Sequence, residues 1–194
     1  DETIREWHKN LKAGGDAAMI PYYAILKMVD EGTPMPDVLT NKRLTQSIWE
    51  KNNAAAEKYN EPGRFTAFIG YEWSSNAGGN NLHRVVMYRD ASDKANQMIP
   101  FSSFISENPE ELWKWMAQYE KKTQGQLLAI PHNGNLSNAR MFQATQFDGS
   151  PITREWAETR ASYETLIEAT QMKGDGEAHP FLSPNDEFAD YETW

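Results

Sequence analysis

The sequence predicts an α/β fold, either a parallel sheet covered by helices or part of a barrel. Short runs of β-branched, aliphatic and aromatic residues predict strands over residues 65–73, 83–88 and 126–130. Helical patterns precede or separate these runs, most clearly over residues 40–59 and 108–124. Alternation of helix and strand is typical of sheets whose strands run parallel.

Composition narrows the class of partner. The 194-residue chain has 28 acidic and 19 basic residues, a net charge of -9. This charge argues against nucleic acid and against an anionic membrane surface, because both attract basic residues. The absence of cysteine excludes thiolate nucleophiles and cysteine-bound zinc, so a metal would be held by His, Asp or Glu. The four histidines are His8, His83, His132 and His179.

The first third of the chain is predicted to be mostly helical. We expect residues 1–64 to form a peripheral or cap segment of a single compact domain whose main part is residues 65–194. An apolar pattern at helical spacing begins at Ile4 and is ended by Gly14-Gly15. A second helix is predicted from Pro21 to Val29, with proline in its first turn.

The next helices have clearer signals. In the segment 40–59, the expected buried face consists of Leu44, Ile48, Ala55 and Tyr59. The helix after it begins at Asn108, an N-cap residue followed by proline and two acids, and Gly125 is expected to end it. Its predicted buried stripe is Leu112, Met116 and Tyr119. A further helix is predicted from Ser150 or Thr153 to Ala161, then a strand over 165–170.

Three polar side chains follow or begin predicted strands. His132 comes directly after the apolar run Leu127 to Ile130, a position from which a side chain can point into a cleft. Glu72 ends the first strand among aromatic residues, where a carboxylate is costly unless it is paired, protonated or metal-bound. His83 begins the second strand. Taken singly, each residue also has a structural interpretation: His132 as a histidine of a turn, Glu72 as an acid that faces solvent, and His83 as a core histidine.

The late polar loop contains two more candidates. Glu177 and His179 lie in a segment where glycines alternate with polar residues, Gly174-Asp175-Gly176-Glu177-Ala178-His179. Such a loop can surround a ligand, although surface turns have the same composition. No phosphate-binding loop, dinucleotide fingerprint or Gly-x-Ser-x-Gly elbow is present in the sequence.

Four motifs together resemble one family. They are Gly70-Tyr71-Glu72-Trp73, Asn80-Asn81-Leu82-His83-Arg84, Ile130-Pro131-His132-Asn133-Gly134-Asn135-Leu136-Ser137, and Gly176-Glu177-Ala178-His179-Pro180 with Ser183-Pro184-Asn185-Asp186-Glu187-Phe188. This combination resembles the PHP superfamily, the metal-dependent hydrolases named for polymerase-associated and histidinol-phosphatase domains, and more closely an uncharacterised branch of it. The resemblance covers the chain from residue 65 onward.

The resemblance implies a fold and a site. The fold would be part of a PHP-like distorted TIM-type (β/α) barrel with metals at the carboxyl ends of its strands. Glu72, His83 and His132 would be metal ligands for Zn, Mn or Fe. The neighbouring catalytic residues would be Asn133, Glu177 and His179.

The family's His-x-His, Asp-His and Asp-x-His motifs do not occur in this sequence. The resemblance therefore implies the middle of a longer protein that lacks more than half of its metal ligands and is inactive alone. Its three ligands would retain one metal weakly, or none, but not a bridged pair. An incomplete barrel would expose apolar faces, so we expect either the missing segments of the parent chain or self-association to cover them.

Three hypotheses follow. The first is a fragment of a metal-dependent hydrolase, acting through metal-activated water on a small anionic substrate, a phosphoester. The second is a non-catalytic carbohydrate- or ligand-binding module, which requires exposed tryptophans such as Trp113, Trp115 and Trp156, whereas helix core is the ordinary reading of these residues. The third is a structural insertion of a larger enzyme. The compartment is not indicated, because the chain begins at Asp1 and ends at Trp194 as if cut from a longer protein.

Overall fold

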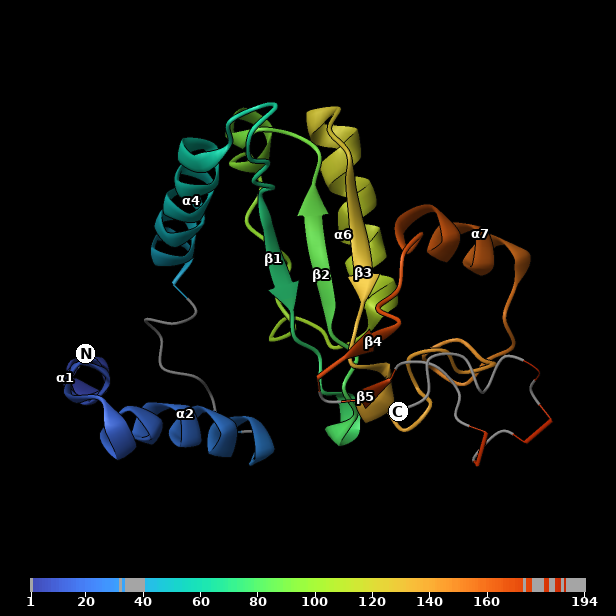
Figure 1. Ribbon diagram of the computed structural model, residues 1–194, viewed down its shortest axis with the longest axis horizontal. Coiled ribbons are helices and arrows are strands. Elements are labelled where there is room, and N and C mark those ends of the chain that lie inside the picture. Colours follow the sequence, from blue (N-terminus) through green and yellow to red (C-terminus); the bar gives the residue numbers. More distant parts are fainter. Residues whose placement is uncertain are drawn as a thin grey trace. The chain divides into compact units, whose positions relative to one another are not determined.

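A computed structural model describes residues 2–31, 33, 41–172, 174–175, 180–181, 184–185 and 187. The chain consists of two compact units, Asp1–Ile48 and Trp49–Trp194. The helices are α1 (Glu2–Ala13), α2 (Gly15–Asp30), α4 (Lys42–Tyr59), α5 (Ser92–Ala95), α6 (Pro109–Thr123) and α7 (Arg154–Tyr163), with short 3-10 turns η1 (Ala77–Gly79) and η2 (Gly134–Leu136). The strands are β1 (Gly70–Trp73), β2 (Arg84–Tyr88), β3 (Leu127–Pro131), β4 (Thr170–Gln171) and β5 (Gly174–Asp175) (Figure 1).

The first unit is helical, as the sequence predicts for this part of the chain. Helices α1 and α2 are separated by Gly14, which has the left-handed backbone that glycine accepts without strain. Helix α2 already begins at Gly15, so Pro21 lies inside the helix and not in its first turn. The division between Ile48 and Trp49 differs from the domain boundary expected after residue 64, which stays a prediction.

The second unit is a mixed α/β structure built on a three-stranded sheet in the order β1-β2-β3. Both strand pairs are antiparallel: Glu72 lies opposite Val85, and Val85 lies opposite Ile130. The expectation of a parallel sheet is therefore wrong for these strands, and the described strands do not close into a barrel.

The reason for the antiparallel order lies between β2 and α6. A parallel crossover would need α6 to start at the end of the sheet where β2 finishes. Instead, residues 89–108 carry the chain back, and Ser75 and Asn76 at the far end of β1 hydrogen-bond to Glu107, just before α6. Helix α6 then runs up beside the sheet, and the short turn 124–126 leads directly into β3 (Figure 1).

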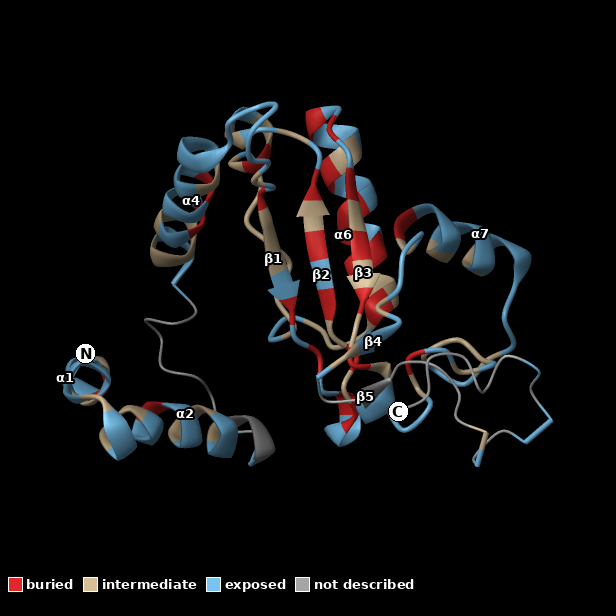
Figure 2. Ribbon diagram, viewed as in Figure 1, coloured by how far each residue is buried: buried red, intermediate tan, exposed pale blue. Residues whose placement is uncertain are grey.

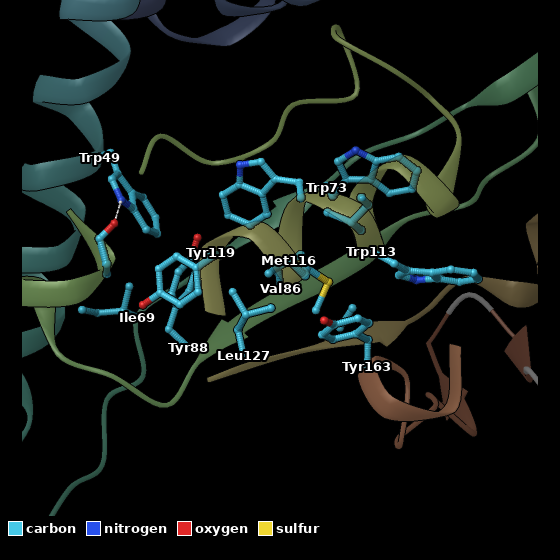
Figure 3. Close-up of a cluster of buried hydrophobic side chains, with 14 residues drawn as sticks. Trp49, Ile69, Trp73, Val86, Tyr88, Trp113, Met116, Tyr119, Leu127 and Tyr163 are labelled. Carbon is cyan, nitrogen blue, oxygen red and sulfur yellow. Dashed lines mark hydrogen bonds between the residues drawn. The ribbon is translucent and has the colours of Figure 1, made fainter. Parts of the chain in front are cut away.

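One face of the sheet packs against α6 and the second half of α4. Along β2 and β3, buried residues alternate with less buried ones, so one side of the sheet points into the core (Figure 2). The cluster is largely aromatic, with edge-to-face pairs such as Tyr88 on Tyr119 at 5.1 Å between ring centroids (Figure 3). Its buried members are Trp49, Ile69, Trp73, Val86, Tyr88, Ala95, Leu112, Trp113, Trp115, Met116, Tyr119, Leu127, Ala129 and Tyr163.

The sequence predicts where helices α4 and α6 lie better than it predicts which of their faces are buried. Asn108 caps α6 through a 2.8 Å bond from the Glu110 N–H, and the predicted stripe of Leu112, Met116 and Tyr119 is buried. In α4 the predicted face is wrong: Ile48 is 57% exposed, whereas Trp49 is buried and donates its indole N–H to Ala95 O at 2.9 Å. The bulkiest side chain, with a polar group that finds a partner, determines which face turns inward.

Of the two late elements, the helix agrees with the sequence and the strand does not. Thr153 caps α7 by accepting the Trp156 N–H at 3.1 Å, which confirms one of the two predicted starts. The predicted strand 165–170 is wrong over most of its length, because only Thr170 and Gln171 pair, and they pair with β5. The Glu168 N–H donates to Pro131 O at 3.2 Å, which holds this segment beside the end of β3.

Gly125 has a different role from the one expected. Gln124, not Gly125, takes the left-handed conformation after α6, with φ of 54°. A Cβ on Gly125 would lie 2.3 Å from Asp90 Oδ2 and 2.9 Å from Tyr119 Cε1. Asp90 is not free to move, because Oδ2 accepts the Gln126 N–H at 2.6 Å. Glycine is thus needed here for close approach.

We therefore expect Gly125→Ala to lower the free energy of unfolding by about 1–3 kcal/mol, the usual cost of overpacking. Urea denaturation monitored by circular dichroism measures this. Gly134→Ala is the matched control, because a Cβ there meets nothing within 4 Å. Equal stability of the two variants would show that the Asp90 turn has room for a methyl group.

Candidate metal centre

The antiparallel sheet brings three predicted side chains to one end. Glu72 lies near the carboxyl end of β1, His83 directly precedes β2, and His132 directly follows β3. Because β2 runs opposite to both neighbours, its beginning lies beside the ends of β1 and β3. The His132 N–H donates to His83 O at 3.2 Å, so the ladder between β2 and β3 extends to the two histidines.

The three side chains also share one face of the sheet. Trp73 and Arg84 are paired across β1 and β2 and are both buried in the core. Side chains alternate along a strand, so the preceding residues Glu72 and His83 point to the opposite face. The same alternation separates His132 from the buried Pro131.

Their donor atoms converge. Glu72 Oε1 lies 2.9 Å from His83 Nδ1 and 2.9 Å from His132 Nε2. The three potential ligand atoms all lie within 4.8 Å of one another. The His83 and His132 side chains are 17% and 15% exposed, whereas that of Glu72 is 48% exposed. The convergence expected of Glu72, His83 and His132 is therefore observed, and their role as metal ligands stays a prediction.

The histidines hold Glu72 in its ionised form. Partial burial alone would raise the pKa of Glu72, but its hydrogen bonding with His132 and His83, together with their charge, outweighs burial and lowers this pKa below its ordinary value of 4.5. A carboxyl group with a lowered pKa stabilises the fold above its ordinary pKa, and this contribution is lost as the pH falls through the lowered value.

Each ring nitrogen of His132 lies beside an acceptor. Its Nδ1 lies 3.3 Å from the carbonyl oxygen of Ile130, and its Nε2 lies 2.9 Å from Glu72. Both partners are acceptors, while a neutral imidazole has a single N–H to donate. With Nδ1–H directed to the carbonyl, the Nε2 lone pair faces an ionised carboxylate unless a proton or a metal cation lies between them.

The donor set fits a divalent metal. Two imidazole nitrogens and one carboxylate oxygen are a common protein ligand set for zinc, and the same donors suit Mn and Fe. Atoms that share one zinc ion at about 2.0–2.2 Å lie about 3–4 Å apart, which is close to the separations observed here. The carbonyl of Ile130 lies at the other nitrogen of His132, the position at which ligating histidines commonly have a hydrogen-bond acceptor.

Asn133 lies beside the cluster in sequence but supports the loop. It has a left-handed backbone with φ of 58°, and its N–H donates to Glu168 Oε2 at 2.8 Å. Its side chain is buried, and its amide oxygen accepts a hydrogen bond from Gln171. Its predicted catalytic role stays a prediction. Glu177 and His179 lie outside the described residues.

Sequence reasoning missed three residues around the cluster. Asn76 Oδ1 lies 3.2 Å from His83 Nε2, Glu168 holds the turn after His132, and Glu164 forms a buried ion pair with Arg84, the neighbour of His83. The alternation of side chains along β2 gave a usable signal for Glu164. Arg84 lies on the same side of β2 as the buried Val86 and Tyr88, so its charge needed a buried acidic partner.

The three tryptophans of the binding-module hypothesis belong to the hydrophobic core and not to an exposed binding surface. Trp113 and Trp115 are buried, and Trp156 packs against the same cluster while donating its N–H to Glu110 at 2.8 Å. They do not form the exposed aromatic surface on which the hypothesis of a binding module depends.

Comparison with known proteins gives a family but no activity. The family model described as "Protein of unknown function (DUF3604)" matches residues 1–194, and the chain belongs to this family. No curated protein and no solved structure matches the chain. Among the described residues, none of the helices has the length and apolar character to cross a membrane.

Proposed function

We propose that this chain provides a metal-binding part of a hydrolase of the PHP type, acting on a small anionic phosphoester. The observation that carries the proposal is the convergence of Glu72, His83 and His132, whose potential ligand atoms lie within 4.8 Å of one another, with Glu72 Oε1 2.9 Å from both His83 Nδ1 and His132 Nε2. Glu72 lies in β1, His83 directly precedes β2, and His132 directly follows β3. They occupy the positions at which the motif resemblance places metal ligands.

Each residue has a separate part in such a site. Glu72 supplies a carboxylate that stays ionised, because hydrogen bonds and charge lower its pKa. His132 is oriented by the carbonyl of Ile130, so that Nε2 is directed at Glu72. When bound, a divalent metal supplies Lewis acidity and lowers the pKa of a bound water to about 7, which makes hydroxide available at neutral pH.

We propose in addition that the sheet is part of a larger fold. The resemblance implies a distorted barrel, and the exposure of apolar side chains on the outer face of the sheet favours further structure that covers this face. Apolar side chains lie on that face beside the cluster, with Val85 39% exposed and Met87 and Ile130 partly exposed. If these strands are part of a barrel wall, they form an antiparallel stretch of it. Other segments of a longer chain, or a second copy, would cover this face.

Metal content tests the proposal. We expect about one Zn, Mn or Fe per chain by elemental mass spectrometry, after metal loading and dialysis, because one His₂Glu set holds one ion. His132→Ala and His83→Ala should each reduce the content to background. His8→Ala is the matched control, since His8 lies on α1 as an exposed residue outside the cluster.

Two results would contradict the proposal. One is metal-free protein after loading with each of the three metals, and the other is equal metal content in all three histidine variants. The hydrolysis of p-nitrophenyl phosphate extends the test to the reaction. We expect this chain alone to be slow, since three ligands hold one ion and not a bridged pair, and any activity should disappear in His132→Ala.

A further inference from the structure

We propose that Asn76 is a positioning residue that accepts the Nε2–H of His83 and thereby directs the Nδ1 lone pair of His83 to the metal. The inference rests on the proposed metal site. It concerns a residue of the Gly/Asn loop between β1 and β2, which from its composition looks like an ordinary turn.

The geometry of His83 requires such a residue. Its Nδ1 faces Glu72 at 2.9 Å, and its Nε2 lies 3.2 Å from Asn76 Oδ1. Both partners are acceptors and a neutral imidazole has one N–H, so a metal on Nδ1 requires that hydrogen on Nε2, where the Asn76 oxygen accepts it. The lone pair then lies on Nδ1, the atom directed into the cluster.

The two histidines of the cluster present opposite ring nitrogens, so each needs its own partner. His132 presents Nε2, and the backbone carbonyl of Ile130 binds its Nδ1. His83 presents Nδ1, and the acceptor at its Nε2 is a side chain, that of Asn76. Ligating histidines commonly have a hydrogen-bond acceptor on the second nitrogen, which fixes tautomer and ring orientation.

The position of Asn76 supports a dedicated role. It occupies the cap position before η1, where asparagine ordinarily accepts a hydrogen bond from a backbone N–H, yet its side chain makes no capping bond. The side chain contacts the His83 ring instead.

Its backbone is fixed by the segment before α6. The Asn76 N–H donates to Glu107 Oε1 at 2.9 Å. The hydroxyl of the fully buried Ser75 donates to the carbonyl oxygen of Glu107 at 2.8 Å. These two hydrogen bonds fix the backbone of residues 75 and 76, so the side chain of Asn76 starts from a fixed position beside His83 whether or not a metal is bound.

The decisive comparison is between Asn76→Asp and Asn76→Ala. A carboxylate can only accept, so Asn76→Asp should keep the hydrogen on Nε2 and bind zinc at least as tightly as the original chain. Asn76→Ala should bind zinc about 10- to 100-fold more weakly, the usual effect of losing an outer partner. Competition with a chromophoric chelator measures these affinities, with zinc alone as the probe.

A matched control separates positioning from general loop damage. Asn81 Oδ1 also contacts His83, but it accepts the backbone N–H at 3.1 Å and not a ring nitrogen. We expect Asn81→Ala to retain the tautomer and the zinc affinity of the original chain. Circular dichroism identifies any variant that fails to fold. If Asn76→Ala does not fold, the comparison of Asn76→Asp with the original chain tests the inference.

Long-range ¹H–¹⁵N correlation spectra of the imidazole rings read the tautomer directly, with and without zinc. With zinc bound, we expect Nε2–H for His83 in the original chain and in Asn76→Asp. Zinc bound to Nε2 of His83 would overturn the inference, as would a loss of zinc affinity in Asn76→Asp equal to that in Asn76→Ala. A chain that binds no zinc contradicts the metal proposal, whereas zinc affinity that is unchanged in Asn76→Ala contradicts this one, so the two failures give different results.

Discussion

Replacing Glu164 by glutamine is expected to lower the free energy of unfolding by about 3–5 kcal/mol, because it leaves the buried guanidinium of Arg84 and the partly buried one of Arg160 without their counter-charge. Glu164 Oε1 lies 3.0 Å from Arg84 Nε, and Oε2 lies 3.0 Å from Arg160 Nη2. The side chains of Arg84 and Glu164 are each only 2% exposed. The indole of Trp113 donates to the same carboxylate at 2.9 Å.

Burial explains the size of this effect. Burial lowers the pKa of Arg84, and the charge of Glu164 and its hydrogen bond oppose that shift. Without Glu164 the desolvation of Arg84 is uncompensated. Arg84 follows His83 directly, so the ion pair also anchors the start of β2 at the candidate site.

The matched control is Glu158→Gln. Arg154 Nε lies 2.7 Å from Glu158 Oε1, but the two side chains are 91% and 65% exposed. An exposed i,i+4 pair contributes about 0.3–0.5 kcal/mol, so this variant should be almost as stable as the original chain. Chemical denaturation of both variants measures the difference. Similar losses in the two variants would show that burial does not determine the strength of these pairs.

Zinc at a free concentration of about 100 times its Kd is expected to raise the free energy of unfolding by about 2.7 kcal/mol, because only the folded chain assembles the three ligands. Thermal unfolding with and without zinc measures the effect. Glu72→Gln should abolish it, since the neutral amide is a poor ligand and removes the carboxylate that both histidines contact.

This stabilisation has a definite pH dependence. Protons compete with zinc for the ligand atoms, so the stabilisation should weaken as the pH falls. Glu72 stays ionised to a lower pH than an ordinary glutamate, because hydrogen bonding and charge lower its pKa from 4.5. Stabilisation that is unchanged at pH 5, or that survives Glu72→Gln, would place the metal at another site.

The candidate site was more predictable than the sheet that carries it. Glu72, His83 and His132 each stand at a strand end, and strand ends can be located from apolar runs and turn residues. Strand direction depends on where residues 89–108 lead the chain. That segment has no periodic pattern, so the sequence does not show that it returns to the starting end of β2.

Other elements depended on tertiary contacts. The buried face of α4 is set by Trp49 and its bond to Ala95, which is remote in sequence. The importance of Asn76 and Glu164 arises from single contacts with His83 and Arg84 across the fold. The local sequence does not distinguish a solvent-facing acidic residue from a buried one. Only the position of Arg84, on the same side of β2 as the buried Val86 and Tyr88, indicated that a buried acidic partner was needed.

The central claim is that Glu72, His83 and His132 bind one metal ion, and anomalous diffraction from a zinc-soaked crystal tests it most directly. We expect one strong anomalous peak about 2.0–2.2 Å from Glu72 Oε1, His83 Nδ1 and His132 Nε2. A peak that contacts none of these atoms, or no peak at the end of the sheet under conditions where zinc saturates the protein, would contradict the account.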